Sequence, residues 1–83
     1  MNNSLSNKLI KVLLDLVIFI EFSNEDIVNE DAAVGILEEV AAELQDLEQE
    51  DKQELLKQIK NLSSMYSSEK KAFLENFSDY FGL

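Results

Sequence analysis

The chain has 83 residues, and its 17 acidic and 7 basic side chains give a formal charge of −10. It contains no cysteine, histidine or proline, which excludes disulfides and catalysis by an imidazole or a thiolate. Residues 1–83 are short enough to form one domain, and the abundance of Leu, Ala, Glu, Lys and Gln favours helix over strand. We therefore expect an all-α fold, a small antiparallel bundle of about four helices.

The negative charge is concentrated in the middle of the chain. Residues 12–51 hold thirteen carboxylates and no lysine, whereas residues 1–11 carry +2 and residues 52–83 carry +1. Such a field repels nucleic-acid phosphates and anionic membranes and attracts basic partners. We therefore expect no nucleic-acid or membrane partner, although acidic side chains also keep small proteins soluble.

The first predicted helix, at about residues 5–22, is apolar on almost every side. One stripe at helical spacing consists of Leu5, Leu9, Val12, Leu13, Leu16 and Ile20. Much of the remaining surface belongs to Ile10, Leu14, Val17, Ile18 and Phe19. Such a helix is either buried at the centre of the bundle or leaves a face for a second subunit. A homodimer through this helix is therefore one expectation.

The same segment has two other interpretations. Its β-branched and aromatic residues between Leu16 and Phe22 leave a strand as an alternative to helix. A signal peptide is not supported, because Asp15 interrupts the apolar run and no small-residue cleavage site follows it. The run is also shorter than the roughly 20 residues that span a bilayer. We expect a mature cytoplasmic protein.

The second predicted helix covers about residues 30–47, after a polar break in which Asn24 and Asn29 are candidate N-caps. Its expected core side is Ala33, Leu37, Val40, Leu44 and Leu47, widened by Val34, Ile36 and Ala41. The opposite arc holds Asp31, Glu38, Glu39, Glu43 and Asp46. Between these acids lie Gly35 and Ala42, whose small size would allow another backbone to approach.

The third and fourth predicted helices follow at about residues 51–64 and 69–80. The third is expected to bury Leu55, Leu56, Ile59, Leu62 and Met65. A serine-rich turn precedes the fourth, in which Ser67 or Ser68 is the expected cap. The fourth is expected to bury Ala72, Phe73, Phe77, Tyr80 and Phe81, with Leu74 at the side. Gly82 is placed to end it.

The sequence contains no motif that would support catalysis or cofactor binding. Paired carboxylates such as Glu38 and Glu39 are expected to be solvated alike, so their pKa values would not separate for acid and base roles. The acidic stretch from Asn24 to Asp31 lacks the glycine and terminal glutamate of a calcium-binding loop. The start of the second helix has no serine that could carry a phosphopantetheine arm, unlike acyl carrier proteins. We expect no enzyme, no cofactor and no metal.

Four segments resemble a group of short acidic bacterial proteins of unassigned function. They are Asn29–Val34, Leu37–Ala42, Phe73–Phe77 and Phe81–Leu83. In size, charge and helical content the whole chain also resembles the immunity proteins of bacterial toxin systems. This resemblance implies an intracellular protein that binds a cognate toxin domain and blocks its active site.

The residues and the resemblance lead to one candidate site and two functional hypotheses. The candidate partner-binding residues are Asp31, Gly35, Glu38, Glu39, Ala42, Glu43, Asp46 and Glu50. Tyr66 and Tyr80 are candidate anchors of the interface. An acidic surface of this kind would oppose the basic cleft of a toxin and speed association. The alternative is a regulatory or adaptor module that self-associates or binds a protein through an apolar helix face.

Overall fold

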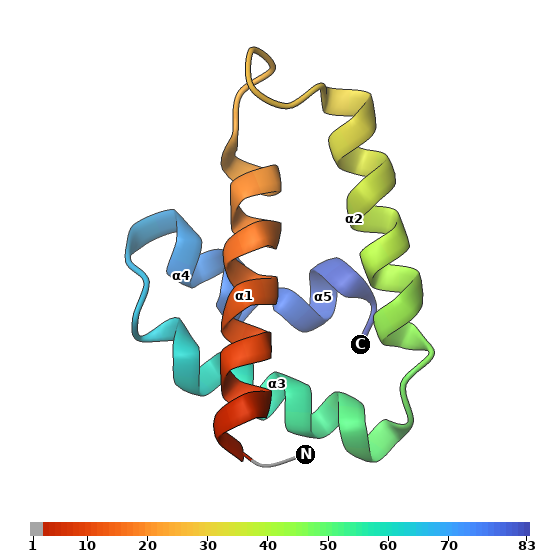
Figure 1. The fold of residues 1–83 in the computed structure, drawn as a ribbon, viewed down its shortest axis with the longest axis vertical. Coiled ribbons are helices and arrows are strands. Elements are labelled where there is room, and N and C mark those ends of the chain that lie inside the picture. Colours follow the sequence, from red (N-terminus) through yellow and green to blue (C-terminus); the bar gives the residue numbers. More distant parts are fainter. Residues whose placement is uncertain (1–2) are drawn as a thin grey trace.

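The chain folds into a small all-α bundle, and the expected fold class is confirmed. The computed structural model describes residues 3–83, in which there are five helices and no strand. They are α1 (Asn3–Phe22), α2 (Glu30–Gln45), α3 (Gln49–Ser63), α4 (Ser68–Glu75) and α5 (Phe77–Phe81). Helices α1 and α2 run antiparallel, and α3 to α5 cross behind and below them (Figure 1).

The boundaries of α1 and α2 follow from local hydrogen bonds. The main-chain amide of Ser23 still bonds to the carbonyl of Phe19, at 3.0 Å, and the chain then turns around Asn24. The amide of Asp26 donates to the Asn24 side chain at 3.1 Å. Asn29 is the N-cap of α2, as expected, because its side-chain oxygen accepts from the amide of Ala32 at 3.1 Å. These capping bonds supply partners for amides that the first turn of a helix leaves unpaired.

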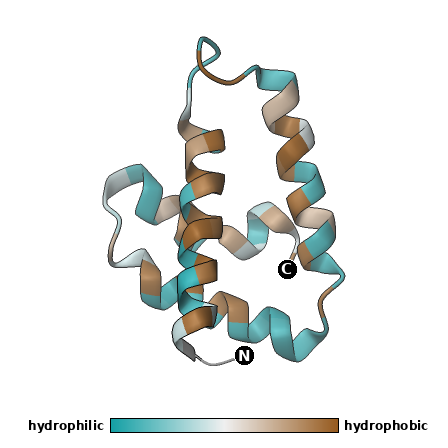
Figure 2. Ribbon diagram, viewed as in Figure 1, coloured by the Kyte–Doolittle hydropathy of each residue, from teal (hydrophilic) through white to brown (hydrophobic). Residues whose placement is uncertain are grey.

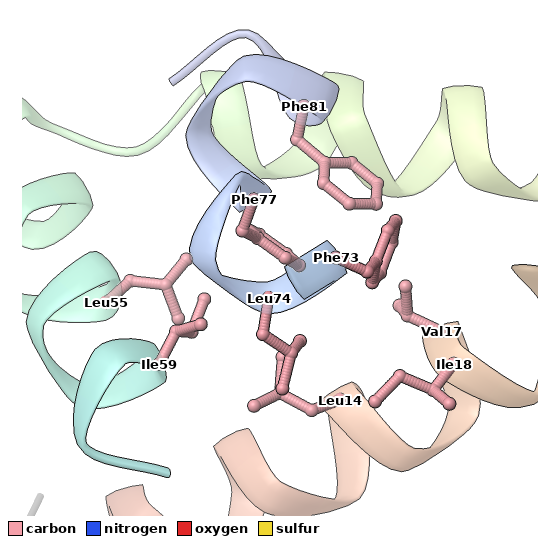
Figure 3. Packing of buried hydrophobic residues seen from close by; sticks show 9 residues of the cluster. All are labelled: Leu14, Val17, Ile18, Leu55, Ile59, Phe73, Leu74, Phe77 and Phe81. Carbon is pink, nitrogen blue, oxygen red and sulfur yellow. The ribbon is translucent and has the colours of Figure 1, made fainter. Parts of the chain in front are cut away.

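The hydrophobic core lies where α1, α3, α4 and α5 meet (Figure 3). Its buried members are Leu14, Val17, Ile18, Leu55, Ile59, Phe73, Leu74, Phe77 and Phe81. Phe77 lies among them, with its ring centroid 6.4 Å from Phe73 and 4.3 Å from Phe81. None of the nine belongs to α2. The fold therefore depends on one face of α1 and on helices α3, α4 and α5.

The single helix expected at residues 69–80 is two helices, α4 and α5, separated at Asn76. The backbone of Asn76 leaves helical geometry, with φ −107° and ψ 18°, while its side-chain amide donates to the carbonyl of Ala72 at 2.9 Å. Ser67 occupies the N-cap position of α4 but makes no side-chain capping bond. Gly82 ends α5 in the left-handed conformation, with φ 68°, as the sequence predicted.

Helix α2 is attached to the rest of the bundle only along one side. No residue of α2 is fully buried, and its apolar residues Ala33, Leu37, Val40, Ala41 and Leu44 are half-buried. Its main contacts are with α1 and α5 (Figure 1). The radius of gyration is 12.8 Å, slightly above the value of about 12 Å typical of a compact chain of this length. The α2 side of the bundle is therefore open.

Several residues expected in the core are exposed. Met65 and Ala72 lie on the surface, as do Val34 and Ile36 of α2 and Leu47, which follows the end of α2. Tyr80 was also expected to be buried, yet it is 62% exposed. The break at Asn76 explains this result for Tyr80, because α5 does not continue the line of α4. Of the two arrangements expected for α1, burial on every side is not observed: one face packs on the core and another is exposed.

Candidate functional site

The acids that the sequence assigned to partner binding share the outward face of α2. Asp31, Glu38, Glu39 and Glu43 are all exposed, as is Asp46 at the C-cap. Ala42 is exposed between them. Nothing lies within 4 Å of the position that a side chain at Gly35 would occupy. No part of the described chain therefore requires a glycine there, and the surface around it is open to a partner.

Glu50 belongs to a different element from the other candidate residues. Helix α3 begins at Gln49, two residues earlier than the sequence indicated, so that Glu50 lies in its first turn. A carboxylate is favourable there because the N-terminal end of a helix carries partial positive charge. The candidate surface therefore consists of residues of α2 and of Glu50, which follows α2 by five positions in the sequence. Glu50 also stabilises the N-terminal end of α3.

The carboxylates of residues 12–51 are almost entirely uncompensated. Within residues 3–83 the one ion pair joins Lys11 to Asp15, with the ammonium nitrogen 2.8 Å from a carboxylate oxygen. None of the acids of α2 takes part in it. Exposed charges interact over about 10 Å at ordinary ionic strength, so neighbouring acids on one helix face reinforce each other. The outward face of α2 therefore carries negative charge that no lysine of the described residues pairs with.

Two adjacent hollows lie along the junction of α1 and α2, and we call them together the acidic furrow. The larger hollow, of about 430 Å³, lies between the end of α1, the turn and the start of α2. The smaller, of about 190 Å³, continues between α2 and α5. Both are lined by Glu21, Val34 and Leu37, which make them contiguous.

The furrow combines an apolar floor with an acidic rim. Its apolar lining consists of Ile20, Val28, Ala33, Val34, Leu37, Ala41, Phe73, Tyr80 and Phe81. Its acids are Glu21, Glu25, Glu30 and Glu38, and no lysine lines either hollow. Glu38 is common to the furrow and to the outward face of α2, so the two surfaces adjoin. Such a hollow suits an amphipathic segment that carries positive charge beside its apolar side chains.

The two tyrosines proposed as anchors have different environments. Tyr80 lines the furrow, where its ring centroid is 4.9 Å from that of Phe73. An exposed aromatic ring at the edge of an apolar hollow is typical of interface anchors. Tyr66 lies elsewhere, in the turn between α3 and α4, and its hydroxyl donates to a carboxylate oxygen of Asp15. Only Tyr80 is therefore placed to contact a partner in the furrow.

The Tyr66–Asp15 bond belongs to a small cluster that connects α1 to the α3–α4 turn. Lys11 donates to both Asp15 oxygens, at 2.9 and 2.8 Å, and its nitrogen lies 5.0 Å from the centroid of the Tyr66 ring. The hydrogen bond from Lys11, followed by that from Tyr66, lowers the pKa of Asp15. Burial, followed by the bond to Asp15, raises the pKa of Tyr66. The cluster has a structural role and no access to the furrow.

Sequence reasoning missed most of the furrow. Glu21 lies within the apolar segment of the first predicted helix, and Leu37 and Ala41 were expected on the core side of the second. One available signal was the acid at the C-terminal end of α1, which faces the acids that open α2 across a short turn. The hollow itself depends on the distance between α1 and α2, which no local sequence pattern specifies.

The described residues offer no metal site and no membrane span. In residues 3–83 no three acids converge as metal ligands would. None of the helices in that range combines the length and the apolarity needed to cross a bilayer. No family model, curated protein or solved structure matches the chain. The case for a function therefore depends on the geometry and charge of the chain itself.

Proposed function

We propose that this chain is a small protein-binding protein that takes a basic, amphipathic segment of a partner protein into the acidic furrow. The observation that supports this most strongly is the open apolar floor between four carboxylates, Glu21, Glu25, Glu30 and Glu38. Apolar side chains of the partner would pack on Val34, Leu37 and Tyr80. Its lysines or arginines would meet the carboxylates at the rim.

Charge and shape have separate roles in this proposal. The exposed acids of α2 extend the negative field beyond the furrow, which speeds the encounter with a basic partner and disfavours acidic ones. The furrow then determines affinity, because buried apolar anchors contribute most of the free energy of binding in protein interfaces. Gly35 and Ala42 leave the outer face of α2 flat enough for a partner backbone to lie against it.

The most concrete form of the proposal is that of an immunity protein that neutralises a bacterial toxin domain. A toxin that cleaves or modifies nucleic acid needs a basic cleft to hold its substrate. A protein with an acidic surface would bind in that cleft and keep the nucleic acid out. It would need no catalytic activity of its own. The negative charge of residues 12–51 and the general resemblance to immunity proteins support this form.

Binding can be tested with two designed helical peptides of identical apolar sequence, one carrying lysines and the other glutamates at its polar positions. We expect the lysine peptide to bind, with an affinity that falls as the salt concentration rises. We expect no binding of the glutamate peptide. Replacing Glu38, Glu39 and Glu43 together by lysine should weaken binding at least tenfold without loss of helical content. Binding measured by fluorescence anisotropy and folding measured by circular dichroism would check both expectations.

A control variant has the same change of charge elsewhere. Glu54, Glu69 and Glu75 lie on α3 and α4, are exposed, and do not line the furrow. Their triple replacement by lysine should leave most of the affinity intact. Equal loss in both triple variants would show that net charge alone attracts the peptide, and the furrow would be rejected as the site.

The toxin form has its own test. If the gene of this chain directly follows a toxin gene, the purified toxin domain should lose its activity at a one-to-one ratio of the two proteins. The variant with lysine at Glu38, Glu39 and Glu43 should not inhibit it. A toxin domain that stays fully active with excess wild-type chain would contradict this form while leaving binding of basic segments open.

A further inference from the structure

Helix α1 carries five large apolar side chains on a face that the fold leaves open, and we call them the outer stripe. They are Leu5, Leu9, Val12, Leu16 and Phe19. Each is between 48 and 57% exposed. They recur at alternating steps of four and three residues, which is the spacing of a seam between two packed helices. The stripe spans about 21 Å at 1.5 Å per residue.

None of the outer-stripe side chains belongs to the hydrophobic core or to the partly buried residues packed against it. The residues of α1 that reach the core are Leu14, Val17 and Ile18, which are at most 5% exposed. They lie on the other side of the helix from Leu9 and Leu16. Figure 1 shows α1 in front of α3, α4 and α5, and Figure 2 shows that it is apolar along most of its length. Soluble monomers rarely expose so continuous an apolar surface.

We propose that the outer stripe is the seam of a homodimer, in which two copies of α1 pack antiparallel about a two-fold axis at Val12. Closed two-fold symmetry is the commonest arrangement of soluble homo-oligomers. With the axis at Val12, Leu5 of one copy meets Phe19 of the partner subunit, and Leu9 meets Leu16 of the partner subunit. The stripe is therefore complementary to its own reversed copy.

The charges beside the stripe favour the antiparallel arrangement. Lys8 and Asp15 lie along one edge of the stripe, four residues before and three residues after Val12. In an antiparallel pair, this edge of one copy lies beside the same edge of the other, with the two chains running in opposite directions. Lys8 then lies beside Asp15 of the partner subunit. A parallel pair would place this edge against the opposite one, which holds Ser6, Leu13 and Ile20 and has no charge. Antiparallel helix dipoles also attract each other.

The size of the contact indicates a weak dimer that is independent of the furrow. Two helices in contact over this length cover about 1,000 Å² in total, near the lower limit for a specific interface. We therefore expect a dissociation constant in the micromolar range. None of the five stripe residues lines the acidic furrow. The dimer would carry two open furrows, and its failure would leave the proposed function untouched.

The oligomeric state tests the seam. Sedimentation of the wild-type chain from micromolar to millimolar concentration should show a shift from 9.5 kDa toward twice that mass. Val12→Glu places two carboxylates together at the axis and should weaken the dimer at least 100-fold with unchanged helical content. Ile36→Glu makes the same kind of change on an exposed site of α2 and should leave the dimer intact.

The absence of cysteine from the sequence allows the orientation to be tested by cross-linking. Under mild oxidation, an antiparallel dimer should couple Val12→Cys to itself and should couple a mixture of Leu5→Cys and Phe19→Cys to each other. Neither of the last two should couple to itself. Self-coupling of both would show a parallel pair and overturn the proposed arrangement.

Two further results would overturn the seam itself. One is a wild-type chain that remains a monomer at millimolar concentration. The other is a Val12→Glu variant that dimerises as well as the wild type. A monomer that binds neutral lipid vesicles through the outer stripe would identify lipid as the occupant in place of a second copy.

Discussion

The side-chain amide of Gln45 donates a hydrogen bond to the main-chain carbonyl of Phe81, with nitrogen and oxygen 2.7 Å apart. It joins the last residue of α2 to the last residue of α5, 36 positions later in the chain. Since α2 contributes no fully buried side chain, this bond is an important part of its attachment. Phe81 also lines the smaller hollow of the furrow, so this bond joins the end of α2 to a residue of the furrow itself.

Replacing Gln45 by alanine should release the end of α2. We expect the free energy of unfolding to fall by about 1 kcal/mol, because the Phe81 carbonyl loses a partly buried donor. Hydrogen exchange of α2 amides should increase more than that of α1 amides. Gln53→Ala, at an exposed site of α3, is the matched control. Similar losses in both variants would show that the Gln45–Phe81 bond is not the cause, since alanine has the higher helix propensity.

The two glycines should respond in opposite directions to alanine. Gly35→Ala should raise the free energy of unfolding by about 1 kcal/mol, since an added side chain meets open space and the helix gains propensity. Gly82→Ala should lower it by a similar amount. Gly82 has a φ of +68°, and its new side chain would come within 2.6 Å of the Gln45 amide. Urea denaturation measures both effects.

The same Gly35 variant also tests the proposed site. If a partner backbone approaches this point of α2, Gly35→Ala should weaken peptide binding while it stabilises the fold. Unchanged binding would place the contact within the furrow alone.

The cluster of Lys11, Asp15 and Tyr66 predicts a specific pH dependence. Its hydrogen bonds lower the pKa of Asp15 below its usual value of 3.8. The folded state therefore binds the proton less tightly than the unfolded state. The resulting stability is fully present above pH 3.8 and is lost as the pH falls through the folded pKa. Because Asp15 is half-exposed, we expect a contribution below about 1 kcal/mol.

Tyr66→Phe measures the hydroxyl's share of that stability. The variant should be less stable than the wild type at pH 7, by about 0.5 kcal/mol. The difference in stability should shrink as the pH falls below 3.8, because a protonated Asp15 accepts a weaker hydrogen bond than the charged carboxylate. Urea unfolding at several pH values would follow this difference. A gap that stays constant from pH 7 to acid would show that the hydroxyl acts through packing.

Phe77 and Tyr80 should separate the requirements of folding from those of binding. Phe77 is buried at the centre of the core, and Phe77→Ala should cost about 3–5 kcal/mol. A loss of that size is comparable to the whole stability of a small domain, so the variant should be largely unfolded by circular dichroism. Tyr80→Ala should remain folded but bind the basic peptide less tightly. Loss of folding in Tyr80→Ala would contradict its assignment to the surface.

The sequence by itself determined the all-α fold class, two of the helix ends and the sign of the surface. Helix-forming composition, the Asn29 cap and the Gly82 stop act within a few residues, so local chemistry is sufficient to specify them. The absence of lysine from residues 12–51 likewise required a negative surface wherever those residues are exposed. The shared outward position of Glu39 and Glu43 follows from their spacing of four residues on one helix.

Only the tertiary structure decided which apolar residues are buried. Helix α1 is apolar on nearly every side, so its periodicity could not distinguish the inner face of Leu14 and Val17 from the outer face of Leu9 and Leu16. The break at Asn76 turned Tyr80 outward, and the distance between α1 and α2 opened the furrow. Each result arises from contacts between residues far apart in sequence, and burial is determined by those contacts and not by local hydrophobicity.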